Sequence, residues 1–202
     1  MEKAVEILMI AAASLIAVTL HELAHGYVAY LMGDPTAKNN GRLTLNPIKH
    51  IDPFGLLALI VLKIGWAKPV PINPMYFRNR KKGMILVSLA GPLTNLSLSF
   101  FFALLCKLMW HSSAVYYLVV FFEIAMQINI GFAVFNLMPF PPLDGSKIVA
   151  ALLPEQLEQK FYQYQRYLVF IVMILYFTNL IDYILYPPIQ FLYGLLYRFI
   201  IF

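Results

Sequence analysis

Long apolar runs constrain this chain more than any other feature of its sequence. Residues 84–109 and 115–137 each contain one charged side chain, and residues 4–20 also contain only one. An α-helix needs about 20 such residues to cross the hydrocarbon core of a bilayer. The whole chain is 61% hydrophobic and 12% charged, whereas soluble domains are about 45–50% apolar and about 25% charged. The sequence therefore predicts an all-α polytopic membrane protein.

Four or five spans are expected within a single membrane-embedded domain, residues 1–202. The predicted spans cover residues 4–32, 84–109, 115–137 and 167–186, and residues 189–202 either cross as a fifth span or lie in the interface. Pro187 and Pro188 are expected to end the fourth span, because proline disrupts a helix interior.

The connection between the first two spans has a different composition. Turn-forming residues in 33–53 predict a loop with a short β segment. Residues 54–62 are too short to cross and are expected to form a re-entrant or interfacial piece.

The basic residues mark orientation and not a nucleic-acid surface. The net charge is +5, and nine Lys and Arg residues lie in the connection between the first two spans: Lys38, Arg42, Lys49, Lys63, Lys68, Arg78, Arg80, Lys81 and Lys82. Basic connections stay on the cytoplasmic side. We therefore expect this connection in the cytoplasm and the N-terminus outside, in a prokaryotic plasma membrane.

A His-Glu-x-x-His pattern occurs at the end of the first apolar run. His21 and His25 are four residues apart, so one helix face presents both imidazoles to a single cation. Glu22 lies beside them, where it could accept a proton from water at the metal. Ionisable side chains in a span are costly and are read as functional by default. The pattern predicts a zinc site.

A catalytic zinc usually has three protein ligands. Asp144 is the best candidate for the third, because its Pro-rich turn beside Gly145 can aim a carboxylate at the imidazoles; an ordinary Asp-Gly turn is the alternative. Asp52 and His50 are rival candidates on a loop nearer in sequence. Cys106 is the only cysteine, which excludes a multi-thiolate site.

Two amides lie inside or at the edge of the spans near these residues. Asn95 and Asn136 either hydrogen-bond between helices or hold a substrate backbone or a developing oxyanion near zinc. Glu123, Gln127 and Asn129 are expected to be packing groups or groups that support the metal ligands.

Three motifs in this order resemble the site-2 protease family of intramembrane zinc metalloproteases, in its short prokaryotic branch without PDZ or CBS domains. They are His21-Glu22-Leu23-Ala24-His25, Ala90-Gly91-Pro92-x-x-Asn95, and Asn136-Leu137-x-Pro139-x-Pro141-Pro142-Leu143-Asp144-Gly145. The likeness covers roughly residues 15–150, including the segments Gly41–Pro47 and Gly65–Pro71.

The resemblance implies one zinc ion held by His21, His25 and Asp144, with Glu22 as the catalytic base. It also implies cleavage of the transmembrane segments of other proteins, within the lipid bilayer and without nucleic acid. A catalytically inactive zinc carrier or scaffold is the alternative, and a hydrolase of lipids or prenylated peptides is a third hypothesis. Transport would need reversible ligands but no positioned base such as Glu22.

Overall fold

The structure is a computed structural model, and it describes residues 2–62, 65–109 and 115–201. Within these ranges the chain is helical and contains no β-strand. The long helices are α1 (Glu2–Leu31), α4 (Arg80–Met109), α5 (Tyr116–Asn136), α7 (Glu155–Phe177) and α8 (Leu180–Ile201). The short ones are α2 (Thr36–Asn39), η1 (Pro47–His50), α3 (Pro53–Leu62), η2 (Pro74–Tyr76) and α6 (Asp144–Leu152). The expected all-α fold is confirmed.

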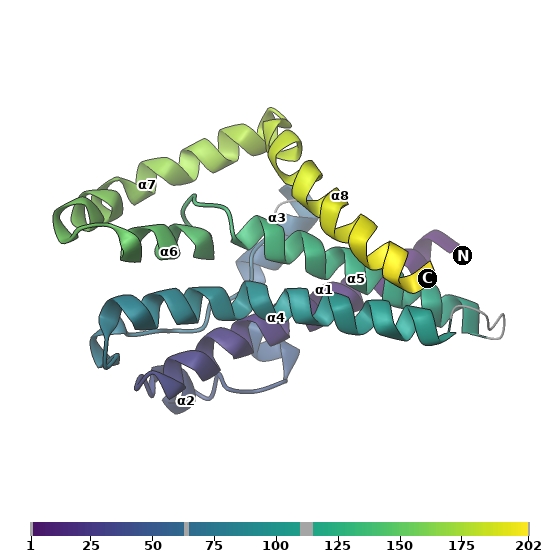
Figure 1. The fold of residues 1–202 in the computed structure, drawn as a ribbon, viewed down its shortest axis with the longest axis horizontal. Helices are drawn as coiled ribbons and strands as arrows, with labels where there is room; N and C mark the ends of the chain where they lie inside the picture. Colours follow the sequence, from purple (N-terminus) through teal and green to yellow (C-terminus); the bar gives the residue numbers. More distant parts are fainter. Residues whose placement is uncertain (1, 63–64, 110–114, 202) are drawn as a thin grey trace.

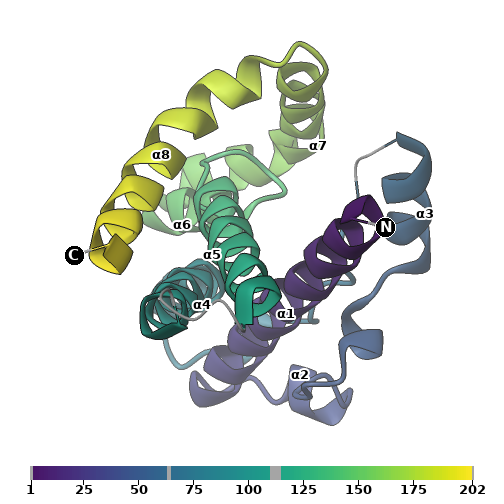
Figure 2. The same cartoon turned by 90° about the vertical axis from the view of Figure 1, so that its right-hand side faces the viewer.

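Helices α1, α4 and α5 form the centre of the molecule, and α5 lies between α1 and α8 (Figures 1 and 2). Together with α8 they form the main core cluster. Its buried side chains are Ala13, Phe102, Ala103, Cys106, Phe122, Ala125, Met126, Ile130 and Ile200. Many are small, which lets helix backbones approach closely, as is common between membrane helices. The core is therefore built from helix-to-helix packing.

Three helices are long and apolar enough to cross a membrane: Lys3–Leu31, Arg80–Met109 and Tyr116–Asn136. They correspond to the first three predicted spans. A fourth crossing is possible if the bent pair Phe170–Phe177 and Leu180–Ile200 counts as one span. The length and apolar composition of these helices identify the chain as an integral membrane protein.

The predicted end of the fourth span at Pro187-Pro188 is wrong. Helix α7 ends ten residues earlier, at Phe177, and the chain turns by 84° before α8 begins. Asn179 at this bend has φ 57°, a left-handed conformation that asparagine tolerates better than most residues. Pro187 and Pro188 lie inside α8. The break therefore comes from an asparagine turn and not from the prolines.

The connection between α1 and α4 forms a layer of short helices and extended chain. The β segment expected in residues 33–53 is reduced to one isolated antiparallel bridge, between Ile51 and Ala67. Arg42 joins the two parts of the layer, because its guanidinium donates to the Lys68 carbonyl at 2.7 Å and to the Pro69 carbonyl at 3.1 Å. Helix α3 has ten residues, too few to cross a bilayer.

Candidate metal centre

Two imidazoles from α1 meet at the centre of the helix bundle. His21 and His25 are one helical turn apart and are 6% and 5% exposed. Their Nε2 atoms are 2.9 Å from each other, and the two rings lie nearly perpendicular, with an interplanar angle of 84°. Both Nε2 atoms therefore face one small volume.

Asp144 completes this arrangement from the other end of the sequence. Its Oδ2 lies 3.1 Å from His21 Nε2 and 2.9 Å from His25 Nε2. Asp144 is the first residue of α6, which packs against α4. The adjacent Gly145 lies so close to the carbonyl oxygens of Leu137 and Met138 that no larger residue would fit. The turn before α6 therefore holds the carboxylate against the imidazoles.

The other oxygen of Asp144 is bound separately, because Lys147 Nζ donates to Oδ1 at 2.8 Å. Burial alone would raise the pKa of the Asp144 carboxyl, but the surrounding hydrogen bonds and positive charge, including that of Lys147, outweigh burial. The pKa of Asp144 therefore lies well below its usual range, and the group is a carboxylate at neutral pH.

The far side of each imidazole is held by an oxygen acceptor. His21 Nδ1 donates to Asn95 Oδ1 at 2.6 Å, and His25 Nδ1 donates to the Val87 carbonyl at 2.6 Å. A neutral imidazole with a proton on Nδ1 carries a lone pair on Nε2. Two nitrogen lone pairs and a carboxylate oxygen thus converge within about 3 Å, an arrangement that repels itself unless a cation lies between them.

The donor set fits zinc. His21, His25 and Asp144 form a group whose ligand atoms all lie within 4.8 Å of one another. Two imidazole nitrogens and one carboxylate oxygen are typical ligands of catalytic zinc, which keeps a fourth position open. Acceptors behind the imidazoles, such as Asn95 and the Val87 carbonyl, are also usual around zinc-binding histidines.

Gly91 provides the room that the imidazoles occupy. A Cβ atom at this position on α4 would lie 2.5 Å from His21 Nε2 and 2.5 Å from His25 Nε2. Both distances are far below van der Waals contact, so any side chain at Gly91 would displace the imidazoles. The glycine of the Ala90-Gly91-Pro92 motif is therefore needed for the close approach of α4 to the candidate metal site.

Glu22 lies beside the ligand group without joining it. Its Oε2 accepts a hydrogen bond from the Val70 backbone N–H at 2.8 Å. Val70 is buried in the extended chain that precedes η2. The carboxylate of Glu22 is thus anchored by the loop layer, and the imidazoles are held by α4.

The structure separates the rival ligands from this centre. His50 is buried in η1, where its Nε2 donates to the Thr44 carbonyl at 2.9 Å. Asp52 Oδ1 accepts from the Gly55 N–H at 2.8 Å. Among the residues that the structure describes, neither belongs to a group of three or more side chains suited to a metal.

The two predicted substrate-binding amides differ in position. Asn95 is fully buried, and its amide contacts His21, the Ala17 carbonyl and Asn129. Asn136 donates to the Phe132 carbonyl of its own helix at 3.0 Å. The geometry therefore places Asn95 behind a ligand, and its role toward substrate stays a prediction, as does that of Asn136.

Sequence reasoning did not identify Val87, Val70 or Lys147. Val87 and Val70 act through backbone groups, which no residue pattern marks. Lys147 was detectable in principle, because it follows Asp144 by three residues on α6 and such pairs meet on a helix.

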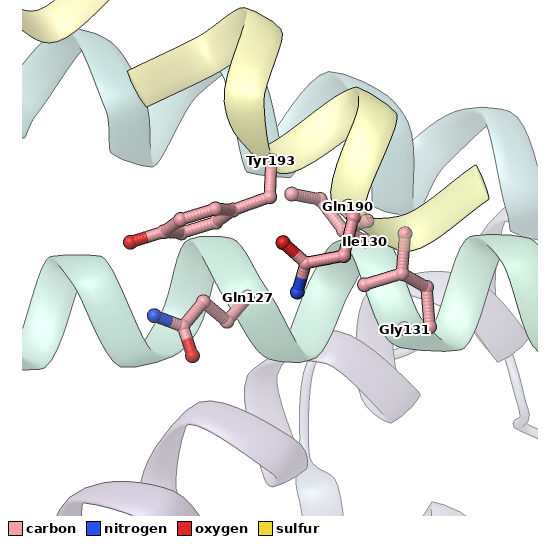
Figure 3. A pocket seen from close by; sticks show the side chains of 6 residues that line it. Gln127, Ile130, Gly131, Gln190 and Tyr193 are labelled. Carbon is pink, nitrogen blue, oxygen red and sulfur yellow. The ribbon is translucent and has the colours of Figure 1, made fainter. Parts of the chain in front are cut away.

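A second polar cluster lies on the other side of α5. Gln127, Gln190 and Tyr193 line an open cavity of about 330 Å³ between α5 and α8 (Figure 3). The Tyr193 hydroxyl donates to Glu123 Oε1 at 2.9 Å. Gln127 and Asn129 are two residues apart, about 200° around the helix, and so face opposite sides.

Comparison with known proteins indicates a family of zinc metalloproteases. The model of peptidase family M50 matches residues 105–180, which include Asp144. The "Putative zinc metalloprotease YwhC" of Bacillus subtilis is 43% identical over 183 residues, 87% of this chain and 83% of that protein. The "Putative zinc metalloprotease Rip2" of Mycolicibacterium smegmatis is 34% identical over 145 residues, 68% of this chain and 54% of that protein.

No solved structure matches the chain significantly. The likeness to YwhC covers most of both proteins, and the matched family model adds the segment around Asp144. This chain is therefore a member of peptidase family M50, the site-2 protease family of zinc metalloproteases.

Proposed function

We propose that this protein is an intramembrane zinc metalloprotease that hydrolyses peptide bonds within or near the transmembrane segments of other proteins. One observation carries the proposal: His21, His25 and Asp144 converge, buried, among helices long and apolar enough to span a bilayer. Its partners are then transmembrane substrates and the surrounding lipid. The bound metal would be one zinc ion, and residues 1–202 would act as one domain.

In this proposal each residue has a separate task. His21, His25 and Asp144 would hold the metal, which when bound polarises a carbonyl and lowers the pKa of water toward about 7. Glu22 would take the proton from the attacking water and pass it to the leaving amine, as a general base and then a general acid. The Val70 N–H would keep the carboxylate of Glu22 in place between the two steps.

The substrate must be opened before it can react. A transmembrane helix keeps its carbonyls in i to i+4 hydrogen bonds, which protect them from water. We therefore expect preference for spans that contain Gly or Pro, which weaken a helix. The basic connection around Arg80 and Lys81 supports a cytoplasmic position for the metal centre, with the N-terminus outside, in the plasma membrane.

The test compares Glu22→Gln with wild type, both purified and reconstituted in lipid vesicles. The substrates are synthetic single-span peptides with a fluorophore and a quencher, made with and without a central Gly-Pro pair. We expect Glu22→Gln to bind one zinc ion per chain and to cleave about 10²- to 10⁴-fold more slowly. Glu6→Gln is the matched control, because Glu6 is exposed on the same helix.

The inactive carrier is the alternative that this experiment separates. A carrier needs its ligands but no positioned base, so Glu22→Gln would leave its zinc handling unchanged, and no peptide would be cut by wild type. Cleavage by Glu22→Gln at the wild-type rate, with zinc bound, would remove Glu22 from its proposed role.

A further inference from the structure

We infer that Asn129 on α5 is a positioning residue, which acts through Asn95 to fix the proton of His21 on Nδ1 and so frees Nε2 for the metal. The inference rests on the metal centre of the proposed function, although not on proteolysis. It assigns a task to a buried amide that touches neither His21 nor Asp144.

A chain of hydrogen bonds links the three helices of the core. Asn129 Nδ2 donates to the Ala125 carbonyl at 2.8 Å, and its Oδ1 accepts from Asn95 Nδ2 at 2.8 Å. Asn95 Nδ2 also donates to the Ala17 carbonyl of α1 at 3.2 Å, and Asn95 Oδ1 accepts from His21 Nδ1 at 2.6 Å. Asn95 and Asn129 are both 0% exposed.

The direction of this chain is set by backbone carbonyls. The carbonyl of Ala125 can only accept, so the amide nitrogen of Asn129 must face it and its oxygen must face Asn95. That oxygen also can only accept, so Asn95 must present its nitrogen to Asn129 and its oxygen to His21. The proton between Asn95 and His21 must then belong to His21 Nδ1.

Reversal of the Asn95 amide would have a specific consequence. Its nitrogen would then face His21 and donate to Nδ1, which would move the ring proton to Nε2. A protonated Nε2 points a hydrogen at the metal site and cannot coordinate zinc. The reversed amide would also press its oxygen against Asn129 Oδ1 and the Ala17 carbonyl. Asn129 therefore stabilises the tautomer that binds metal.

Loss of Asn129 would remove the shorter of the two bonds that hold the Asn95 nitrogen. One buried N–H would be left unsatisfied, which is costly in an apolar interior. The amide of Asn95 would then depend on the 3.2 Å contact with Ala17 alone. Changes behind a metal-binding histidine typically weaken metal affinity by about 10- to 100-fold.

The experiment measures zinc dissociation constants by competition with a chelator, in purified protein in lipid nanodiscs. We expect Asn129→Leu to bind zinc about 10- to 100-fold more weakly than wild type. Asn129→Asp should restore the affinity to within about threefold, because a neutral buried carboxylic acid donates to Ala125 and accepts from Asn95 in the same way.

Gln127→Leu is the matched control. Gln127 is on the same helix, carries an amide, and lines the cavity between α5 and α8 (Figure 3). We expect it to bind zinc as wild type does. Equal zinc affinity in Asn129→Leu and wild type would overturn the inference, and so would equal weakening in Asn129→Leu and Gln127→Leu.

A second measurement does not depend on Asn129→Leu. Nitrogen-15 NMR of histidine-labelled, metal-free wild type reports which ring nitrogen of His21 carries the proton, and His21→Gln identifies its signals. We expect the proton on Nδ1, and a proton on Nε2 in the neutral ring would overturn the inference even if Asn129→Leu does not fold.

These results are distinguishable from failure of the proposed function. Wild type that binds zinc and cuts no peptide would refute proteolysis and leave the role of Asn129 intact. Wild type that binds no zinc would refute both.

Discussion

The two sides of α5 show how differently polar groups are treated in one membrane helix. On one side, Asn129 is fully enclosed and each of its amide groups has a partner, in a chain that ends at His21. On the other side, Gln127 borders an open cavity with Gln190 and Tyr193. A buried amide must be paired to be tolerated, and pairing makes its direction definite. We expect changes to be costly on the closed side and mild on the open side.

The largest effect on the closed side should come from a ligand. His25→Ala removes an Nε2 that lies 2.9 Å from both His21 and Asp144. We expect zinc content, measured by atomic emission on purified protein, to fall to background, because a three-ligand site loses one of its ligands. His50→Ala is the control, since His50 is buried but lies outside the group. Full zinc content in His25→Ala would show that the closed side is not the metal centre.

A smaller but still large effect is expected from Gly91 on α4, with Gly131 on α5 as the control. Gly91→Ala would place a methyl group 2.5 Å from both Nε2 atoms, so we expect zinc affinity to fall and the unfolding free energy to drop by about 1–3 kcal/mol. Gly131→Ala on α5 has no atom within 4 Å of its added Cβ, so it should leave zinc binding unchanged. Chelator competition and thermal unfolding in detergent measure both quantities. Similar zinc affinity in the two variants would remove the distinction between the two sides.

The smallest effect is expected in the cavity itself. The double variant Gln127→Leu with Gln190→Leu replaces two exposed amides by apolar side chains of similar length. We expect zinc content to be unchanged and stability to stay within about 0.5 kcal/mol, because such surface changes disturb no buried network. A loss of zinc in this variant, measured beside wild type, would show that the open side of α5 is coupled to the metal centre.

Local patterns predicted the parts of the site that one helix can define. His21 and His25 depend only on the period of α1, so their pairing could be read directly. Asp144 lies more than 100 residues later, and no local pattern brings it to α1; the Pro-rich turn made it a candidate, and packing of α6 on α4 places it. Asn95 was identified as an amide inside a span, but its contact with His21 depends on how α1 and α4 face each other.

The long helices of the fold were predictable from the sequence, but the short connecting segments and the bend between α7 and α8 were not. Hydropathy located α1, α4 and α5, because each has enough apolar length on its own. Only one isolated bridge forms where a β segment was expected in residues 33–53. The structure of such short, turn-rich segments depends on the parts of the protein that pack against them. The bend at Asn179 was missed because an asparagine in a left-handed conformation leaves a weaker signal than the two prolines of α8.

The hydrogen bond from Val70 to Glu22 has a consequence for how the protein could be controlled. The imidazoles are supported by α4 and α5. The carboxylate of Glu22 is held instead by the loop that contains Val70, and Arg42 binds the Lys68 and Pro69 carbonyls of that loop. A displacement of Val70 would therefore be expected to shift the Glu22 carboxylate more than the imidazoles of His21 and His25. The metal-binding imidazoles and the proposed proton acceptor, Glu22, are thus held in place by different parts of the chain.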